Sequence, residues 1–215
     1  MYLPLAFKGA GMRCLIIGGG EVALRKLLFL TGAGCRVTVI APRIHSEIRS
    51  AVTGLGMEWM AREFAPGDCR GYQLVIAATG RREINLTIFE EAAGLCIPIN
   101  VVDDPDLCTV IFPAVWRQGP LTISVNTEGT APFMASVVRD RLSSGGASLS
   151  RWVEAAAGFR AAVRSEIGDW KEKESLYRRF AESIRPGDPP DPPDGTELRC
   201  WLAWLETLGR DGSGE

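Results

Sequence analysis

The chain has 215 residues, of which 46% are hydrophobic and 23% are charged, and its formal net charge is -2. This composition is typical of a globular, enzyme-sized protein, and the net charge gives no general attraction to nucleic acid, so we expect no nucleic-acid partner. No apolar stretch reaches the roughly 18 to 20 residues that a bilayer-spanning helix needs. The first residues also lack the basic-then-apolar order of a secretory signal. We therefore expect a cytoplasmic protein that does not cross a membrane.

The six cysteines are widely spaced and form no CxxC pair. They are Cys14, Cys35, Cys69, Cys96, Cys108 and Cys200. Several of them lie inside apolar runs, where cysteine serves as a small hydrophobic residue. We expect buried thiols, and we expect no structural metal because no His, Cys or Asp residues cluster at metal-ligand spacing.

The first forty residues have the pattern of a strand, a helix and a second strand. The β-branched run at residues 13–17 ends at a glycine, and residues 22–30 repeat apolar side chains at helical spacing before Gly32. Residues 36–40 ("RVTVI") then alternate as a strand does. The unit predicts a parallel sheet with a right-handed crossover.

The alternation of strands and helices continues to about residue 102. The pattern predicts a helix at 46–55, a weak strand at 58–62, a strand at 73–79, a helix at 82–93 and a strand at 96–102. The strand at 73–79 is almost continuously apolar, which suits a strand covered on both faces. Together these elements predict a doubly wound α/β fold.

The pattern changes after Pro113. A strand at 121–125 and a loop "NTEGTAP" precede a predicted helix at 132–142, which has proline in its first turn. The run "SSGGAS" at 143–148 interrupts the chain. Between residues 149 and 184, a helical stripe is predicted from the apolar residues at 149, 152, 153, 156, 159, 163, 167 and 170. A helical unit should therefore follow.

The segment at 185–195 ("RPGDPPDPPDG") is rich in proline, which removes backbone donors and fixes φ, so it should be an extended linker. Beyond it, five apolar residues share one face of a short helix: Leu198, Trp201, Leu202, Leu205 and Leu208. That helix needs a surface to pack on, either in its own chain or in a partner.

A glycine-rich turn joins the first strand to the first helix. Gly18, Gly20 and Ala23 satisfy the pattern G-x-G-x-x-G/A in the required position between strand and helix. Glycines allow a tight turn and the close approach of a pyrophosphate, while a helix that begins near Glu21 points free N–H groups at that anion. The sequence predicts a dinucleotide site, and a tight turn without a ligand is the alternative.

The second strand lacks the acidic residue that often holds the adenosine ribose. Ile40 is followed instead by Ala41, Pro42 and Arg43. Arg43 could meet the 2′-phosphate of NADP or could be an ordinary solvated cation. The residues by themselves do not decide between NAD and NADP.

Two aspartates follow the predicted strand at 96–102. In an open α/β sheet the reactive groups lie beyond the carboxyl ends of the strands, and a carboxylate there can accept a proton. Asp103 and Asp104 are in this position, although both could instead cap the turn at Pro105. His45 is the only histidine, and we interpret it as a neighbour of a helix cap.

Four runs of the sequence resemble a known family. They are "GGGEVALRK" (18–26), "VIAATG" (75–80), "INVVDDPDLCTVIFPA" (99–114) and "GPLTISVNTEGTAPFMASVVR" (119–139). In this order they resemble the precorrin-2 dehydrogenase/sirohydrochlorin ferrochelatase family, which forms the first part of siroheme synthase. The resemblance covers roughly residues 1–180, and the runs after Asn100 are its most specific part.

The resemblance implies an organisation of the chain into domains. An NAD-binding Rossmann domain would span residues 1–112, a dimerisation segment 113–147 and a helical tail domain 148–184. The proline-rich linker at 185–195 and the C-terminal helix and tail at 196–215 lie outside the resemblance. It also implies a homodimer formed through the middle segment.

The resemblance further implies a reaction. Precorrin-2, a reduced tetrapyrrole with eight carboxylates, loses a hydride to NAD⁺ and a proton, which gives sirohydrochlorin. Many members then insert Fe²⁺ to make siroheme, and the sequence does not decide whether this chain does so.

The family's essential aspartate, the residue after "NVV", corresponds to Asp103. The positions that the resemblance assigns to the cofactor are Gly18, Gly19, Gly20, Glu21, Val22, Pro42, Arg43 and Thr79. In some members a serine in the loop before the 132–142 helix affects activity, and Thr127 stands there in this chain, with Ala131 in place of a second serine.

Two other classes of function share parts of this pattern. Another NAD(P)-dependent oxidoreductase would act on a different small substrate. A non-enzymatic NAD-sensing module would share the glycines but would not need the run "NVVDDPD". Oxidation of precorrin-2 separates both classes from the family reaction.

Overall fold

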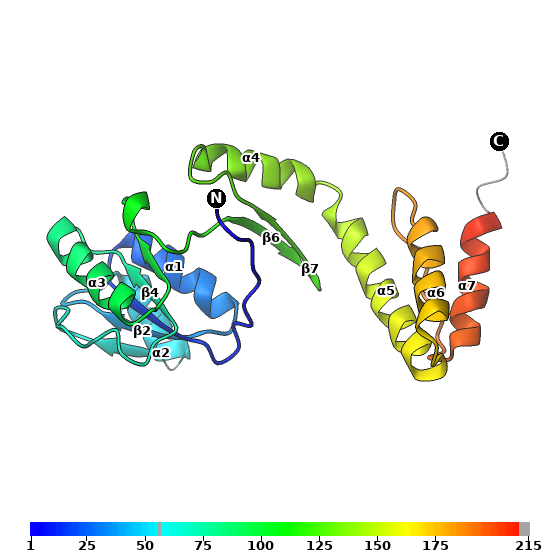
Figure 1. Cartoon of the computed structure of the whole chain (residues 1–215), viewed down its shortest axis with the longest axis horizontal. Helices are drawn as coiled ribbons and strands as arrows, with labels where there is room; N and C mark the ends of the chain where they lie inside the picture. Colours follow the sequence, from blue (N-terminus) through cyan, green and yellow to red (C-terminus); the bar gives the residue numbers. More distant parts are fainter. Residues whose placement is uncertain (56, 211–215) are drawn as a thin grey trace. The chain divides into compact units, whose positions relative to one another are not determined.

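The structure is a computed structural model that describes residues 1–55 and 57–210 (Figure 1). The chain divides into two compact units, one at Met1–Phe112 and the other beginning at Pro113. Across the described ranges, none of the helices combines the length and the apolar character that crossing a membrane requires.

The first unit is built on a parallel sheet. Its strands are β1 (Arg13–Ile17), β2 (Arg36–Ile40), β3 (Glu58–Met60), β4 (Leu74–Ala77) and β5 (Ile99–Val101). They lie in the order β3-β2-β1-β4-β5, and every neighbouring pair is parallel. The α/β prediction is confirmed, and this order is that of a Rossmann-type sheet.

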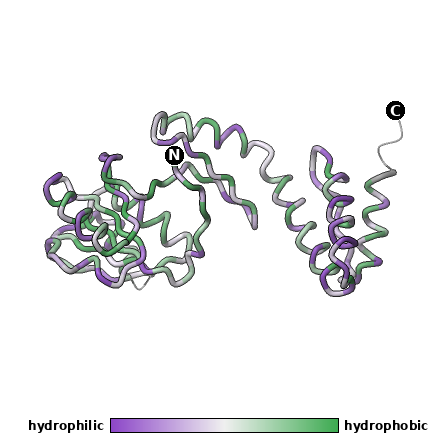
Figure 2. The backbone as a smooth tube through the Cα atoms, in the orientation of Figure 1, coloured by the Kyte–Doolittle hydropathy of each residue, from purple (hydrophilic) through white to green (hydrophobic). Residues whose placement is uncertain are grey.

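Helices cover both faces of this sheet. They are α1 (Glu21–Gly32), α2 (Ser46–Leu55) and α3 (Arg82–Gly94). Successive side chains of β1 point to opposite faces: Ile16 packs in the same core cluster as Leu27 of α1, and Leu15 packs with Ile88 of α3. Because β1 is covered on both sides, it is apolar almost throughout. Figure 2 shows hydrophobic stretches (green) through the middle of this unit and hydrophilic ones (purple) mainly on its outer turns.

The observed strands are shorter than the sequence predicts. β4 begins one residue later and ends two residues earlier than the run at 73–79, and β5 occupies only three residues of the run at 96–102. Cys96 has a left-handed backbone (φ 55°), and its N–H bonds to Ala93 at the end of α3, so it belongs to the helix–strand turn. β3 ends at Met60 because the Arg62 N–H bonds back to the Met60 carbonyl.

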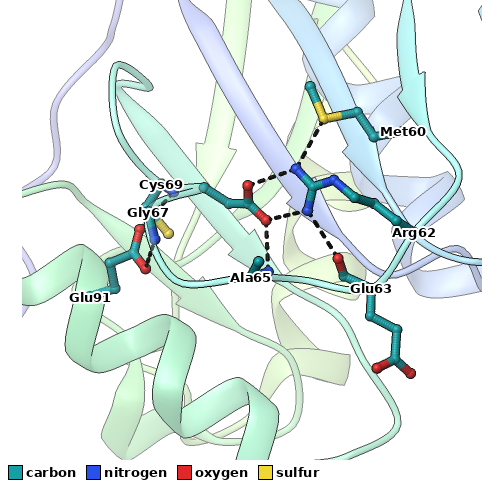
Figure 3. A network of polar contacts seen from close by, with 8 residues as sticks. Met60, Arg62, Glu63, Ala65, Gly67, Cys69 and Glu91 are labelled. Carbon is teal, nitrogen blue, oxygen red and sulfur yellow. Dashed lines mark hydrogen bonds and ion pairs between the residues drawn. The ribbon is translucent and has the colours of Figure 1, made fainter.

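Two carboxylates hold the connection between β3 and β4 in place (Figure 3). Asp68 accepts two hydrogen bonds from Arg62, at 2.6 and 2.7 Å, and a third from the Ala65 N–H at 2.8 Å. Glu91 of α3 accepts the N–H groups of Gly67 and Cys69 at 2.7 and 2.8 Å. The Arg62 hydrogen bonds lower the pKa of Asp68, although the burial of this carboxyl opposes the shift.

The second unit begins with a hairpin that the sequence predicts only in part. β6 (Ala114–Gln118) pairs antiparallel with β7 (Leu121–Val125), which confirms the predicted strand at 121–125. β6 was missed, because its half-exposed residues show no strand-like alternation. α4 (Pro132–Ser143) packs against both strands of the hairpin and extends one residue beyond its predicted end.

Three helices complete the second unit: α5 (Gly146–Glu166), α6 (Trp170–Glu182) and α7 (Leu198–Arg210). The continuous stripe predicted at 149–184 is wrong in part, because Asp169 accepts the Glu172 N–H at 2.9 Å and thereby starts a separate helix. Leu149 and Trp170 are 45% and 67% exposed and do not belong to a buried stripe. The "SSGGAS" interruption is limited to two residues, 144 and 145.

The C-terminal helix packs on its own chain. Its side chains join α5 and α6 in one cluster, whose aromatic members are Trp152, Phe159, Phe180, Trp201 and Trp204. The linker at 185–195 has no helix or strand, as predicted, and two indole N–H groups fix it: Trp152 donates to Gly187 at 2.9 Å and Trp204 donates to Asp191 at 3.0 Å. Residues 211–215 of the predicted tail lie outside the described residues.

Candidate functional site

The three glycines after β1 have different structural roles. Gly18 has φ 127°, and a Cβ built on it would overlap the Ala78 carbonyl oxygen. A Cβ on Gly19 would overlap the Arg43 carbonyl oxygen. The close approach of neighbouring loops therefore accounts for Gly18 and Gly19 without any ligand.

Gly20 is different, because a Cβ built there would have no protein atom within 4 Å. Gly20 is the N-cap of α1 and supplies no side-chain cap, and its carbonyl accepts the Leu24 N–H at 3.0 Å. The N–H groups of Glu21 and Val22 in the first turn have no partner within the helix, and the helix dipole is positive at this end. The open space and these donors fit the pyrophosphate of a dinucleotide.

The loop after β2 lies against the glycine turn. The His45 N–H donates to the Gly19 carbonyl at 2.7 Å, while Pro42 and Arg43 are exposed. The Nδ1 atom of His45 accepts the Glu47 N–H at 3.3 Å, so the imidazole itself caps the start of α2, whereas the sequence predicted only a neighbour of the cap.

The loop after β4 carries Thr79, whose hydroxyl lies 2.5 Å from the side-chain oxygen of Asn85 and 3.1 Å from the Arg81 carbonyl. Asn85 is buried on α3, and its amide group donates back to the Thr79 carbonyl at 3.3 Å. Asn85 was not predicted from the sequence. A polar residue at a buried position of an amphipathic helix is the signal that could have found it.

Asp103 and Asp104 are in different environments. Asp103 is exposed and has a left-handed backbone with φ 60°, and its carboxylate makes no ion pair within the ranges that the structure describes. The Asp104 side chain is only 17% exposed and accepts a hydrogen bond from Arg82 Nε at 3.0 Å. The Asp104 carbonyl also accepts the Leu107 N–H, which starts the short helix η1 (Pro105–Leu107). Asp104 is therefore the N-cap residue of η1 and the ion-pair partner of Arg82, but its side chain makes no capping hydrogen bond.

The Cys108 thiol fastens the turn that carries Asp103. Its Sγ atom lies 3.1 Å from the Val101 carbonyl, 3.2 Å from the Val101 nitrogen and 3.4 Å from the Asp104 carbonyl. Burial raises the pKa of this thiol, so it remains protonated and can donate at neutral pH. No sequence pattern indicates this role, because Cys108 resembles any other cysteine in an apolar run.

A lysine of α1 lies close to the same turn. The Lys26 ammonium is 3.9 Å from the centroid of the Phe112 ring, which is a cation–π distance. Burial lowers the pKa of Lys26, and Arg25 lowers it further.

The sheet topology brings the predicted site residues to one edge. β1 pairs with β4 and β4 pairs with β5, all in parallel, so the loops at Gly20, Thr79 and Asp103 leave from the same side. Two strand spacings of about 4.8 Å place the ends of β1 and β5 roughly 10 Å apart. Within residues 1–55 and 57–210, no three His, Cys, Asp or Glu side chains are grouped so that they could hold a metal ion.

Comparisons with known proteins agree with this architecture. The chain is 38% identical over 184 residues to a siroheme synthase of Pseudomonas fluorescens, which covers 82% of this chain and 38% of that protein. It is also 38% identical over 201 residues to a siroheme synthase of Pseudomonas paraeruginosa, which covers 87% of this chain and 42% of that protein. The chain thus spans about two-fifths of the length of these relatives.

A solved structure shares the fold. It is described as "SirC, precorrin-2 dehydrogenase" and superimposes with a TM-score of 0.71 at 18% identity, over 98% of this chain and all of that chain. Residues 5–114 match a family model described as "Putative NAD(P)-binding". These residues include the glycine turn, the parallel sheet and the turn that carries Asp103, and the chain therefore belongs to this NAD(P)-binding family.

Proposed function

We propose that the chain oxidises precorrin-2 to sirohydrochlorin with NAD⁺ as the acceptor. The names of its relatives and of the solved structure that shares its fold support this reaction, as do the residues at the carboxyl edge of the sheet. One observation carries the proposal: Asp103 is exposed and without an ion-pair partner among the described residues, at the same sheet edge as the open glycine turn.

The cofactor site would be formed by the residues predicted from the sequence. They are Gly18, Gly19, Gly20, Glu21, Val22, Pro42, Arg43 and Thr79. The backbone of the α1 N-terminus would bind the pyrophosphate, and the exposed loop at 42–43 would lie beside the adenosine ribose. When bound, NAD⁺ supplies a hydride acceptor. The absence of a carboxylate after β2 leaves the ribose to backbone contacts and to Arg43.

Asp103 would act as the acid/base group. The oxidation removes a hydride and one proton from precorrin-2, and the Asp103 carboxylate is available to accept or guide that proton. Cys108 and the Asp104–Arg82 pair would keep the turn in place during the transfer.

The first experiment is to mix the purified chain with precorrin-2 and NAD⁺ and to follow the absorbance of sirohydrochlorin. Formation of sirohydrochlorin supports the proposal. NADH production from another substrate, but not from precorrin-2, would instead identify a different oxidoreductase. Binding of NAD⁺ without turnover of any substrate would indicate a sensing module. A second incubation with Fe²⁺ measures whether siroheme also forms.

We also propose that the chain forms a homodimer through the middle segment. α4 presents one apolar side to solvent, formed by Phe133, Met134, Val137, Val138 and Leu142. Exposed apolar patches of this kind mark association surfaces, and a two-fold dimer would cover the same patch on both copies.

A further inference from the structure

The end of β2 lacks the carboxylate with which a dinucleotide site often holds the adenosine ribose. The strand is followed by Ala41, Pro42 and Arg43, so a cation lies where an acid is common. The loop after the neighbouring strand β3 does carry an acid, Glu63, but this carboxylate pairs with Arg81 at 3.1 Å. The loops that follow these two strands therefore provide an exposed arginine and a carboxylate that already has a partner.

The backbone of the loop after β2 is held in place on both sides of Arg43. Before it, the Ala41 carbonyl accepts the indole N–H of Trp59 at 2.9 Å. After it, the His45 N–H donates to the Gly19 carbonyl at 2.7 Å. The Arg43 side chain itself is exposed. A fixed backbone thus presents this guanidinium to solvent at the carboxyl end of the strand.

The same loop lies directly against the glycine turn. The Arg43 carbonyl oxygen would be only 2.1 Å from a Cβ built on Gly19. The next residue, Gly20, faces open space at the start of α1. A pyrophosphate bound at Gly20 would therefore bring the adenosine ribose of the same dinucleotide to the loop that carries Arg43.

Arg43 differs from other arginines at this edge of the sheet. Arg62 pairs with Asp68 at 2.6 Å, and Arg82 pairs with Asp104 at 3.0 Å. Arg43 forms no ion pair within residues 1–55 and 57–210. A guanidinium without a carboxylate partner can bind a phosphate through paired, charge-assisted hydrogen bonds.

We propose that Arg43 binds the 2′-phosphate of NADP⁺, so that the chain binds NADP⁺ at least as tightly as NAD⁺. The two cofactors differ only at the 2′ position of the adenosine ribose, where NADP⁺ carries a phosphate and NAD⁺ a hydroxyl. The inference rests on the part of the proposed function that assigns a dinucleotide to the glycine turn, and it does not depend on which substrate is oxidised.

The test titrates the full chain with NAD⁺ and with NADP⁺ by isothermal titration calorimetry, in the absence of precorrin-2. Arg43→Gln should weaken NADP⁺ binding by at least about tenfold, because hydrogen bonds between charged groups are lost. It should weaken NAD⁺ binding much less, because the 2′-hydroxyl carries no charge. In the unmodified chain, NADP⁺ binding should also fall more steeply with salt concentration than NAD⁺ binding does.

A second variant, Arg43→Glu, places an acid after β2. It should bind NAD⁺ but not NADP⁺, because a carboxylate can accept a hydrogen bond from the 2′-hydroxyl and repels the 2′-phosphate. Its NAD⁺ binding would show that the variant is folded. Binding of NADP⁺ by Arg43→Glu as tightly as by the unmodified chain would contradict the assignment of Arg43.

The matched control is Arg36→Gln, which removes the same charge from the exposed residue at the opposite end of β2. It should bind both nucleotides as the unmodified chain does. Four results would each overturn the proposal: unchanged NADP⁺ affinity in Arg43→Gln, an equal loss of affinity for the two nucleotides in that variant, a similar loss of NADP⁺ affinity in Arg36→Gln, or weaker binding of NADP⁺ than of NAD⁺ by the unmodified chain.

The outcomes separate this inference from the proposed reaction. Tight, Arg43-dependent binding of NADP⁺ by a chain that oxidises precorrin-2 with neither cofactor would support the inference and contradict the reaction. Oxidation of precorrin-2 with NAD⁺ by a chain that binds NADP⁺ only weakly would contradict the inference and leave the reaction in place. Binding of neither nucleotide would contradict both.

Discussion

Among single residues, the three glycines of the turn have two different roles: packing requires two of them, and the third is open to a ligand. Gly18 and Gly19 face the carbonyl oxygens of Ala78 and Arg43, so the folded chain itself requires them. Gly20 faces open space at the start of α1. The glycine motif therefore contains two residues that the fold needs, Gly18 and Gly19, and one, Gly20, whose open position suits a ligand.

Substitution of each glycine should distinguish the two that packing requires from the one that faces open space. Gly18→Ala and Gly19→Ala should lower the free energy of unfolding, because each new Cβ overlaps backbone of another loop. Gly20→Asp should fold normally but lose most of its NAD⁺ affinity, because it places a negative charge where the pyrophosphate approaches. Thermal melts and NAD⁺ titrations measure both effects. Unchanged NAD⁺ affinity in folded Gly20→Asp would remove the glycine turn from the cofactor site.

The two neighbouring aspartates provide a second test. Asp103→Asn keeps the size of the side chain, and asparagine tolerates the left-handed backbone at this position, so the variant should fold and bind NAD⁺. Its rate of sirohydrochlorin formation should fall by about 10²–10⁴-fold, which is typical for loss of a general base. Any iron insertion should fall with it.

Asp104→Asn is the control for this variant. It weakens the ion pair with Arg82 but leaves the Asp103 carboxylate in place, so its rate should fall much less. Near-normal turnover in Asp103→Asn would show that the proton leaves through another group.

At the scale of elements, the structure explains the helix that follows the proline-rich linker. Trp201 of α7 lies against α5 at Gly158, where a Cβ would be 2.5 Å from the indole ring. The rings of Trp201 and Phe159 lie 6.2 Å apart, and Trp201 is 5% exposed. α7 is therefore part of the core of the helical region.

Removal of this indole should destabilise the second unit. Trp201→Ala should lower its free energy of unfolding by about 3–5 kcal/mol, as large-to-small substitutions in cores do. Urea unfolding followed by tryptophan fluorescence measures the change. Glu206→Ala, at an exposed position of the same helix, should change the free energy by less than about 0.5 kcal/mol. Similar values for the two variants would contradict the packing of α7 on α5.

The connection between β3 and β4 should make stability depend on pH. Arg62 lowers the pKa of Asp68 in the folded chain below the unfolded value of about 3.9. A lowered folded pKa stabilises the fold above the unfolded pKa, and this contribution is lost as the pH falls through the folded pKa. The difference in unfolding free energy between the unmodified chain and Asp68→Asn should therefore be largest above about pH 4 and should shrink below it. A difference that grows on acidification would contradict this assignment.

At the scale of the whole molecule, the proposed dimer depends on α4. Phe133 is 73% exposed and Val137 lies one turn further along the same apolar side. Neither residue has a place in the core of its own unit. A second copy would remove both from water, which favours association.

The double variant Phe133→Glu/Val137→Lys should be monomeric at micromolar concentration, whereas the unmodified chain should sediment as a dimer. The variant should keep its melting temperature within a few degrees at equal monomer concentration, apart from the stabilisation that dimerisation gives. Trp170→Lys, at an apolar position of α6 that is also exposed, should remain dimeric. A monomeric unmodified chain would refute the dimer, and a dimeric double variant would place the interface elsewhere.

The elements whose local signals agree could be predicted from the sequence alone. The parallel strands, their helices and the glycine turn follow from hydrophobic periodicity and turn residues, which act over a few positions. The position of Asp103 after β5 also follows, because the strand order of a doubly wound sheet fixes which loops meet at one edge. The reaction was predicted from a resemblance of four sequence runs and not from these physical patterns.

The differences between neighbouring residues arise only when the chain is folded. Gly19 differs from Gly20 because the loop at Arg43 approaches it, and Asp104 differs from Asp103 because Arg82 of α3 pairs with it. The clamp at Cys108 likewise depends on contacts that packing creates between a turn and the segment after it. Such contacts join residues that have no fixed spacing, so no local pattern records them. Hydrophobic spacing therefore determined the framework, and three-dimensional packing decided which polar groups remained available for chemistry.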